Sequence, residues 1–271
     1  MVYFLVNTWN AQGRAITYKE LREAILDGDI DSKIMQEWYE DYARFVLKHL
    51  QPAWEDAMIA ATDALAEKYP DWYFNPSAEG VAEWTKTHTA EFVTSVTQTQ
   101  IEGLRAVIRQ AANLEHMNVD QLARAIRPMV GLYRQQATAN LNYYNKLIES
   151  GVNEKKALDL SVRYAARQHR YRGYLIARQE LAMAYNTGAD QGVRQAQAAG
   201  YMGEMVKVWC TADDERMCKG CGKLDGKVVG MDEDFEADRP RGYQFTHLYP
   251  PLHYMCRCTV MYKEVSPPKA K

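Results

Sequence analysis

The stretches Cys218-Lys219-Gly220-Cys221 and His253-Tyr254-Met255-Cys256-Arg257-Cys258 decide the fold of the last quarter of the chain. They place four of the five cysteines and one of the six histidines in two short clusters. Zinc takes four thiolate or imidazole ligands in a tetrahedron, and a two-residue gap between cysteines lets a tight turn direct both thiolates at one ion. The two clusters therefore predict a small module stapled by zinc.

The second cluster offers three candidate ligands for two coordination places. We expect Cys218, Cys221, His253 and Cys258 to bind the ion, with Cys256 as the substitute ligand. In an extended Cys-x-Cys segment both side chains point to the same face, so small backbone changes select one or the other. Five candidates for four places favour a closed structural site, because a catalytic zinc normally keeps one position open.

Disulfides are the alternative use of these cysteines. An odd number of cysteines would leave one unpaired. The N-terminal apolar run is short, has no basic leader and is followed by no small-residue cleavage site, so we expect no secretory signal. A reducing, intracellular setting would favour metal binding over disulfides.

The composition is that of a folded protein with one or two cores. The 271 residues include 33 basic and 35 acidic side chains, and 47% of residues are hydrophobic. No stretch is long and apolar enough to predict a membrane span.

Upstream of the cysteines, apolar residues recur every three to four positions, which predicts long antiparallel helices. Thr17 and Glu20 form a capping-box pattern, Pro52 should kink or split a helix, and Asn118 should cap another that pauses at Arg127-Pro128. The helices are expected over residues 17–28, 31–68, 75–117, 118–127, 135–150, 154 to about 168 or further, and 171–199. The fold class is thus mainly α, with a small C-terminal β-rich module.

The predicted domain organisation has four parts. They are an unassigned helical region at 1–117, a helical part at 118–200, the zinc-stapled β module at 201–262 and a disordered tail at 263–271.

The β module should contain short extended runs after Gly200. Met205–Cys210 alternates like a strand, with Val206, Val208 and Cys210 on one side and Lys207 on the other. We expect Cys210 to act as a small apolar residue. A turn at Asp225-Gly226 leads into a second strand, and residues 258–262 form a closing strand.

Five arginines and one histidine lie between Arg163 and Arg178 without an acidic residue. Arg163, Arg167 and Arg170 share one helical face, so this basic stripe could contact nucleic-acid phosphates or an acidic partner protein. The alternative is a solvated face neutralised by acidic residues of another helix.

Spaced motifs also carry a family resemblance. The pattern from Thr211 through Cys218 and Cys221 to Gly226, followed by Pro250-Pro251-x-His253-x-x-Cys256-Arg257-Cys258, resembles the C-terminal signature of the Mu F-like minor head proteins of tailed bacteriophages. Residues 137–151 and 176–188 resemble two helices of that family, so the resemblance covers roughly residues 118–262. Gln179 and Tyr254 depart from the common pattern, where threonine and proline are usual, but neither is a candidate ligand.

The resemblance implies a virion protein that is made in the bacterial host cytoplasm and acts inside the phage head. It implies association with the portal protein and other head proteins, in head assembly or genome delivery (DNA ejection). The alternative interpretation is a nucleic-acid-binding protein that uses the basic stripe and the zinc module, and its partner would be packaged DNA. No catalytic residue is predicted, because the sequence lacks the His-x-Glu of zinc deaminases, the His-Glu-x-x-His of zincin proteases and a nucleotide-binding P-loop.

Overall fold

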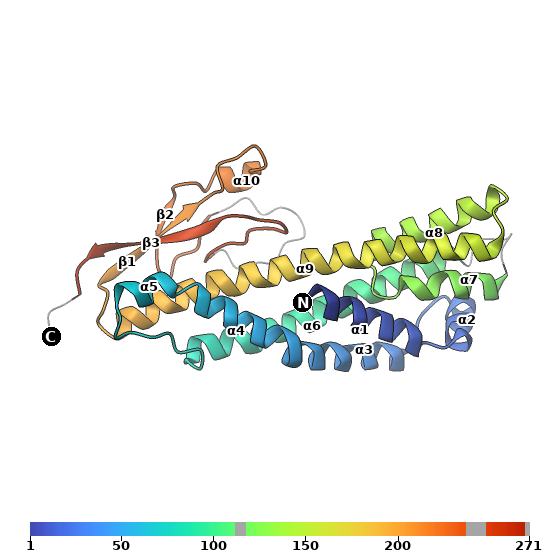
Figure 1. The fold of residues 1–271 in the computed structure, drawn as a ribbon, viewed down its shortest axis with the longest axis horizontal. Coiled ribbons are helices and arrows are strands. Elements are labelled where there is room, and N and C mark those ends of the chain that lie inside the picture. The colour runs from blue at the N-terminus through green and yellow to red at the C-terminus, as the bar shows by residue number, and fades with distance from the viewer. Residues whose placement is uncertain (112–117, 237–247, 269–271) are drawn as a thin grey trace. The chain divides into compact units, whose positions relative to one another are not determined.

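The computed structural model describes residues 1–111, 118–236 and 248–268 (Figure 1), and it divides into two compact units. Unit 1 comprises residues 1–50 and 87–174, and unit 2 comprises residues 51–86 and 175–271. The two longest helices, α6 (Glu79–Ala111) and α9 (Glu154–Ala198), contribute residues to both units. The described residues include no helix that could cross a membrane. The prediction of a mainly helical fold with a small C-terminal sheet is confirmed.

Unit 1 is helical, and its helix ends follow the predicted capping signals. Thr17 and Glu20 form the reciprocal capping box, and Gly28 ends that helix in the left-handed region at φ 76°. Asn118 and Gln121 form a second capping box, and the helix after it changes to a 3₁₀ turn at Arg127-Pro128. Besides its parts of α6 and α9, unit 1 contains α1 (Val2–Ala15), α2 (Tyr18–Asp27), α3 (Ser32–Phe45), the π-helix η1 (Val46–Leu50), α7 (Val119–Ile126), η2 (Arg127–Met129) and α8 (Arg134–Glu149).

Pro52 is accommodated by a change of helix type. The π-helix η1 lies directly before α4 (Gln51–Ala60), and α5 (Asp63–Lys68) follows after a break. Proline lacks an N–H and its ring crowds the carbonyl four residues earlier, so a wider helical turn relieves that crowding. The predicted interruption near Pro52 is confirmed.

Helix α9 corrects the prediction of two separate helices with a break near residue 169. It runs unbroken over 45 residues. Two polar residues at the expected break are buried and hydrogen-bonded. His169 donates from Nε2 to the Val130 carbonyl at 2.9 Å, and Arg172 donates to the Gly131 carbonyl and, at 2.8 Å, to Thr99 Oγ1. Because tertiary contacts satisfy these side chains and no proline intervenes, the helix continues.

In unit 2, α9 packs closely against α4. A Cβ atom added at Gly188 would lie 2.3 Å from the Cα of Met58, a separation that real Cβ atoms do not reach. Only a residue without a side chain permits this approach between the two helix backbones.

The C-terminal module is a three-stranded antiparallel sheet in the order β2-β1-β3. Its strands are β1 (Glu204–Cys210), β2 (Val228–Gly230) and β3 (Thr259–Ser266), with the short helix α10 (Lys219–Gly222) between β1 and β2. Val208 is opposite Val228 on one neighbour and Met261 on the other. Strand β3 continues to Ser266, so it includes residues that the sequence assigned to the tail.

Strand β1 alternates as predicted, but the side that carries Lys207 is the buried one. Met205, Lys207 and Trp209 are buried, whereas Val206, Val208 and Cys210 are half-buried. Lys207 has no exposed surface, and its Nζ donates to the carbonyls of Glu233 at 2.9 Å and Leu248 at 3.0 Å. Cys210 is half-buried on the other side of the strand, and its Sγ donates to the Val208 carbonyl. The loop carbonyls account for the burial of the lysine.

Candidate metal centre

The first cysteine pair is shaped by a tight turn at the start of α10. Cys218 is the N-cap residue, and its Sγ accepts a hydrogen bond from the backbone N–H of Cys221 at 3.3 Å. The N–H of Gly222 donates to the Cys218 carbonyl at 3.0 Å. The turn therefore brings both sulfur atoms to one side, as the two-residue gap predicts.

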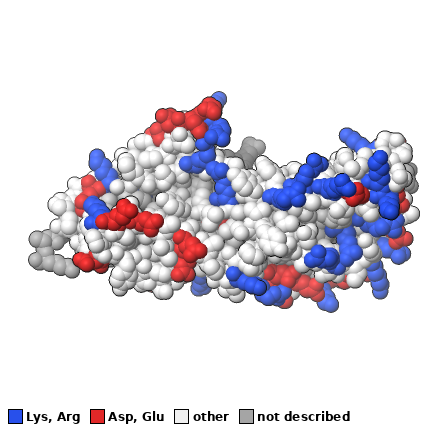
Figure 2. Space-filling model, in the orientation of Figure 1, with Lys and Arg blue, Asp and Glu red and all other residues white. Residues whose placement is uncertain are grey.

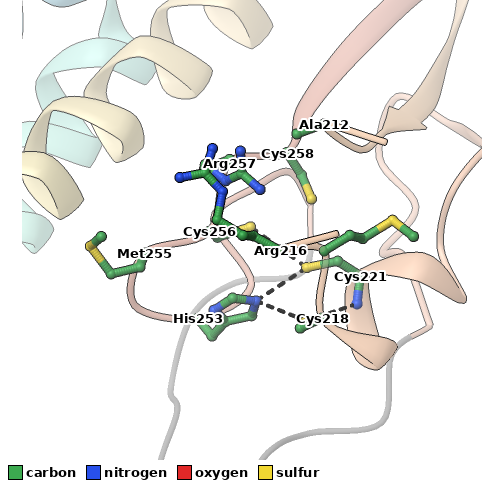
Figure 3. A pocket seen from close by; sticks show the side chains of 10 residues that line it. Ala212, Arg216, Cys218, Cys221, His253, Met255, Cys256, Arg257 and Cys258 are labelled. Carbon is green, nitrogen blue, oxygen red and sulfur yellow. Dashed lines mark hydrogen bonds between the residues drawn. The ribbon is translucent and has the colours of Figure 1, made fainter. Parts of the chain in front are cut away.

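His253 presents its Nε2 atom to this pair. Its Nδ1 donates to the Tyr254 carbonyl at 2.7 Å, and since a carbonyl only accepts, the ring proton belongs to Nδ1. The Nε2 atom lies 3.1 Å from Cys218 Sγ and 3.2 Å from Cys221 Sγ (Figure 3). A hydrogen bond that fixes the tautomer and frees the other ring nitrogen is usual for a metal-binding histidine.

The two remaining cysteines lie close to Cys221. Cys256 Sγ is 3.7 Å from Cys221 Sγ. The backbone N–H of Cys256 donates to the His253 carbonyl at 3.0 Å, which closes the turn from His253 to Cys256. Cys221, Cys256 and Cys258 have their sulfur atoms within 4.8 Å of one another, as do the ligand atoms of Cys218, Cys221 and His253. All five predicted candidates are thus gathered in one place.

The donor set fits zinc. Four thiols and one imidazole are the soft and borderline ligands that zinc prefers. A Zn–S distance of about 2.3 Å gives a tetrahedral sulfur–sulfur separation of about 3.8 Å. The Cys221–Cys256 distance of 3.7 Å already matches this value. The centre is backed by a hydrophobic cluster of the same module that includes Trp209, Leu224, Phe235, Leu252 and Val260.

Shared hydrogen bonds shift the pKa values of the thiols. Hydrogen bonding between Cys221 and Cys256 raises the pKa of Cys221 and lowers that of Cys256. At Cys218 burial acts to raise the pKa, but the hydrogen bonds with Cys221 and the neighbouring His253 outweigh it, so the pKa is lowered. The cluster therefore contains sulfur atoms that favour the thiolate form, which is the form that binds metal.

An ion pair fixes the segment between the last two cysteines. Both terminal nitrogens of Arg257 donate to the Asp214 carboxylate, one of them at 2.6 Å. The bond to Arg257, with a further bond from the Arg216 N–H, lowers the pKa of Asp214 to about 2. Asp214 thus acts as a hydrogen-bond acceptor for Arg216 and Arg257. The roles of Arg257 and of the Tyr254 carbonyl had no recognisable signal in the sequence.

The basic stripe is only partly exposed. Arg163, Arg167 and Arg170 are exposed on α9, whereas His169 and Arg172 are buried. Arg163 pairs with Asp159 at 2.9 Å, and Arg167 lies over the Tyr164 ring at 5.6 Å. Basic side chains gather over the region of α8 and the first part of α9 on the face shown in Figure 2. The exposed stripe is therefore three arginines, one of which has an acidic neighbour.

Comparison with known proteins gives one family. The family model described as Phage Mu protein F like protein matches residues 117–261, which is more than half of the chain. Searches of curated proteins and of solved structures found no significant match. The matched range includes α7 to α9, the cysteine clusters and the first three residues of β3. The chain therefore belongs to the Phage Mu protein F-like family of phage head morphogenesis proteins.

Proposed function

We propose that the protein is a minor head protein that associates with the portal inside the procapsid and acts in head assembly or genome delivery without catalysis. The family match carries this proposal, because it includes both the helical part and the cysteine module. The match begins at residue 117, which supports a separate N-terminal region at 1–117, followed by the helical part at 118–200 and the β module at 201–262.

We propose one structural zinc ion as the staple of the module. Cys218, Cys221 and His253 would hold it, with Cys258 or its substitute Cys256 as the fourth ligand. When bound, the ion would supply charge neutralisation and a covalent-like link between the α10 turn and the segment before β3. These segments are 35 residues apart at Cys218 and His253, so one ion would close a long loop.

Metal analysis tests the zinc centre. Full-length protein purified under reducing conditions should contain about one zinc per chain, and a chelator should lower its thermal stability. Cys221→Ser should lose the metal, because Cys221 lies within reach of every other candidate ligand. Cys210→Ser is the matched control, since Cys210 donates to the Val208 carbonyl and lies outside both ligand groups. A metal-free preparation with unchanged stability would exclude the zinc staple.

Portal association is tested by co-purification from assembling phage heads. We expect portal protein to be retained with the tagged chain at about 0.5 M salt, because apolar interfaces persist where phosphate contacts weaken. Retention of nucleic acid alone, lost at that salt concentration, would contradict the proposal and support the alternative.

The alternative function is nucleic-acid binding, and the exposed face of Arg163, Arg167 and Arg170 favours it. Replacing all three by glutamine should make DNA binding less dependent on salt. The slope of log K against log salt concentration should become smaller by about 0.9 for each lost phosphate contact. The same change at Lys19, Lys33 and Arg44, which are exposed on α2 and α3, is the control. An equal decrease of the salt slope in both variants would show non-specific charge attraction and would contradict a DNA-binding role for this face.

A further inference from the structure

The five ligand atoms of the cysteine module form two sets of three, and Cys221 belongs to both. Cys218, Cys221 and His253 make one set, and Cys221, Cys256 and Cys258 make the other, each within 4.8 Å. Among the described residues no set of four meets that limit. A single tetrahedral ion needs four donors about 3.8 Å apart. One ion in either set would therefore leave two donors of the other set unused.

A bridging Cys221 would use all five donors at once. Its sulfur lies 3.2 Å from His253 Nε2 in one set and 3.7 Å from Cys256 Sγ in the other. Cys221 is also buried, at 3% exposure, whereas Cys218 and Cys258 are half-buried. A thiolate has several lone pairs, so one sulfur can bind two ions while each ion keeps three protein ligands.

Charge supports the same arrangement. Four thiolates carry four negative charges, the imidazole with its proton on Nδ1 is neutral, and two divalent ions carry four positive charges. The loaded centre is then neutral, which suits a partly buried site. Met217, Met255, Arg216 and Arg257 also line the pocket. The thiolate and imidazole donors are ligands that soft and borderline metal ions prefer.

We propose that the module binds two thiophilic divalent ions bridged by Cys221, the first at Cys218 and His253 and the second at Cys256 and Cys258. This inference rests on the proposed zinc centre and extends it. The protein as purified holds about one ion with four protein ligands. When the metal is in excess, Cys256 and Cys258 bind the second ion, and each ion then has three protein ligands and one place for water.

Metal titration of the full-length protein tests the proposal, with Cd²⁺ as the probe. Native mass spectrometry should count two ions per chain in the wild type and in Cys210→Ser, and one in Cys258→Ser. ¹¹³Cd NMR should show two resonances in the wild type that are coupled through the shared sulfur. Circular dichroism of the zinc-loaded Cys258→Ser variant should show a wild-type fold, because the first set of ligands is intact.

The outcomes separate this inference from the zinc staple. One ion in the wild type would overturn the bridged centre and leave a single structural zinc. Two ions in Cys258→Ser would overturn the assignment of the second ion to Cys256 and Cys258. No ion in any form would overturn both. If Cys258→Ser does not fold, the wild-type NMR spectrum decides, since two uncoupled resonances would also overturn a shared sulfur.

Discussion

His169 should make the helical unit 1 sensitive to acid. Its ring is 3% exposed, donates to the Val130 carbonyl at 2.9 Å and lies 5.5 Å from the Trp9 ring. Burial lowers the pKa of His169 to about 4. The hydrogen bond to Val130 acts to raise this pKa, and the positive charge of Arg172 lowers it further. The native ring is therefore neutral, whereas the unfolded chain titrates near the ordinary value of 6.5.

The sign and size of the effect follow from these two pKa values. Between pH 6.5 and pH 4 the unfolded chain binds more protons than the native state, so acidification lowers the free energy of unfolding. The contribution is fully present above pH 6.5. The loss is about 2 kcal/mol at pH 5 and approaches about 3 kcal/mol below pH 4.

Urea unfolding at several pH values, followed by circular dichroism, measures this contribution. His169→Gln retains a donor for Val130 but has no titrating group, so its stability should fall less than that of the wild type between pH 7 and pH 5. Acid release of a metal would affect both proteins equally and cancels in the difference. His49→Gln replaces a half-buried histidine of η1 and is the control. Its free energy of unfolding should keep most of the pH dependence of the wild type. Parallel pH profiles for the wild type and His169→Gln would refute the reasoning.

Two further substitutions test the packing of unit 2 by thermal unfolding. Gly188→Ala should destabilise by about 1–3 kcal/mol despite the better helix propensity of alanine, because the new Cβ meets the Met58 backbone. In the control Gly80→Ala the new Cβ meets only the movable end of Gln191, so no loss is expected, and equal effects would contradict the packing argument. Lys207→Met should cost about 2–4 kcal/mol, because two loop carbonyls lose their donor. Lys263→Met, on the exposed strand β3, should change stability by less than about 0.5 kcal/mol, and similar losses at both lysines would show that the buried bonds contribute little.

Local signals in the sequence predicted the features that depend on nearby residues. The capping boxes at Thr17 and Asn118 join residues three apart, and the 3₁₀ turn at Pro128 follows from the missing N–H of proline. The Cys218–Cys221 turn is equally local. All five candidate ligands could be named for the same reason, since each cluster spans only a few residues.

The continuity of α9 could not be predicted, because it depends on distant partners. His169 and Arg172 look like surface residues in a basic stretch, yet their hydrogen-bond partners Val130 and Gly131 are 39 and 41 residues away. The same contacts bury two of the basic side chains of the stripe, His169 and Arg172. A count of basic residues in the sequence therefore overstates the charge that this helix offers to a phosphate.

Strand β1 shows why an alternating pattern does not decide which face is buried. Three apolar residues on one side and a lysine on the other would ordinarily place the lysine in water. Here the Lys207 ammonium is held by carbonyls 26 and 41 residues away and lies 5.7 Å from the Phe235 ring. Its aliphatic stem contributes apolar area to the buried side. The loops before and after residues 237–247 thus determine the orientation of the strand, and Val208 is left on the outer face between the exposed Val228 and Met261.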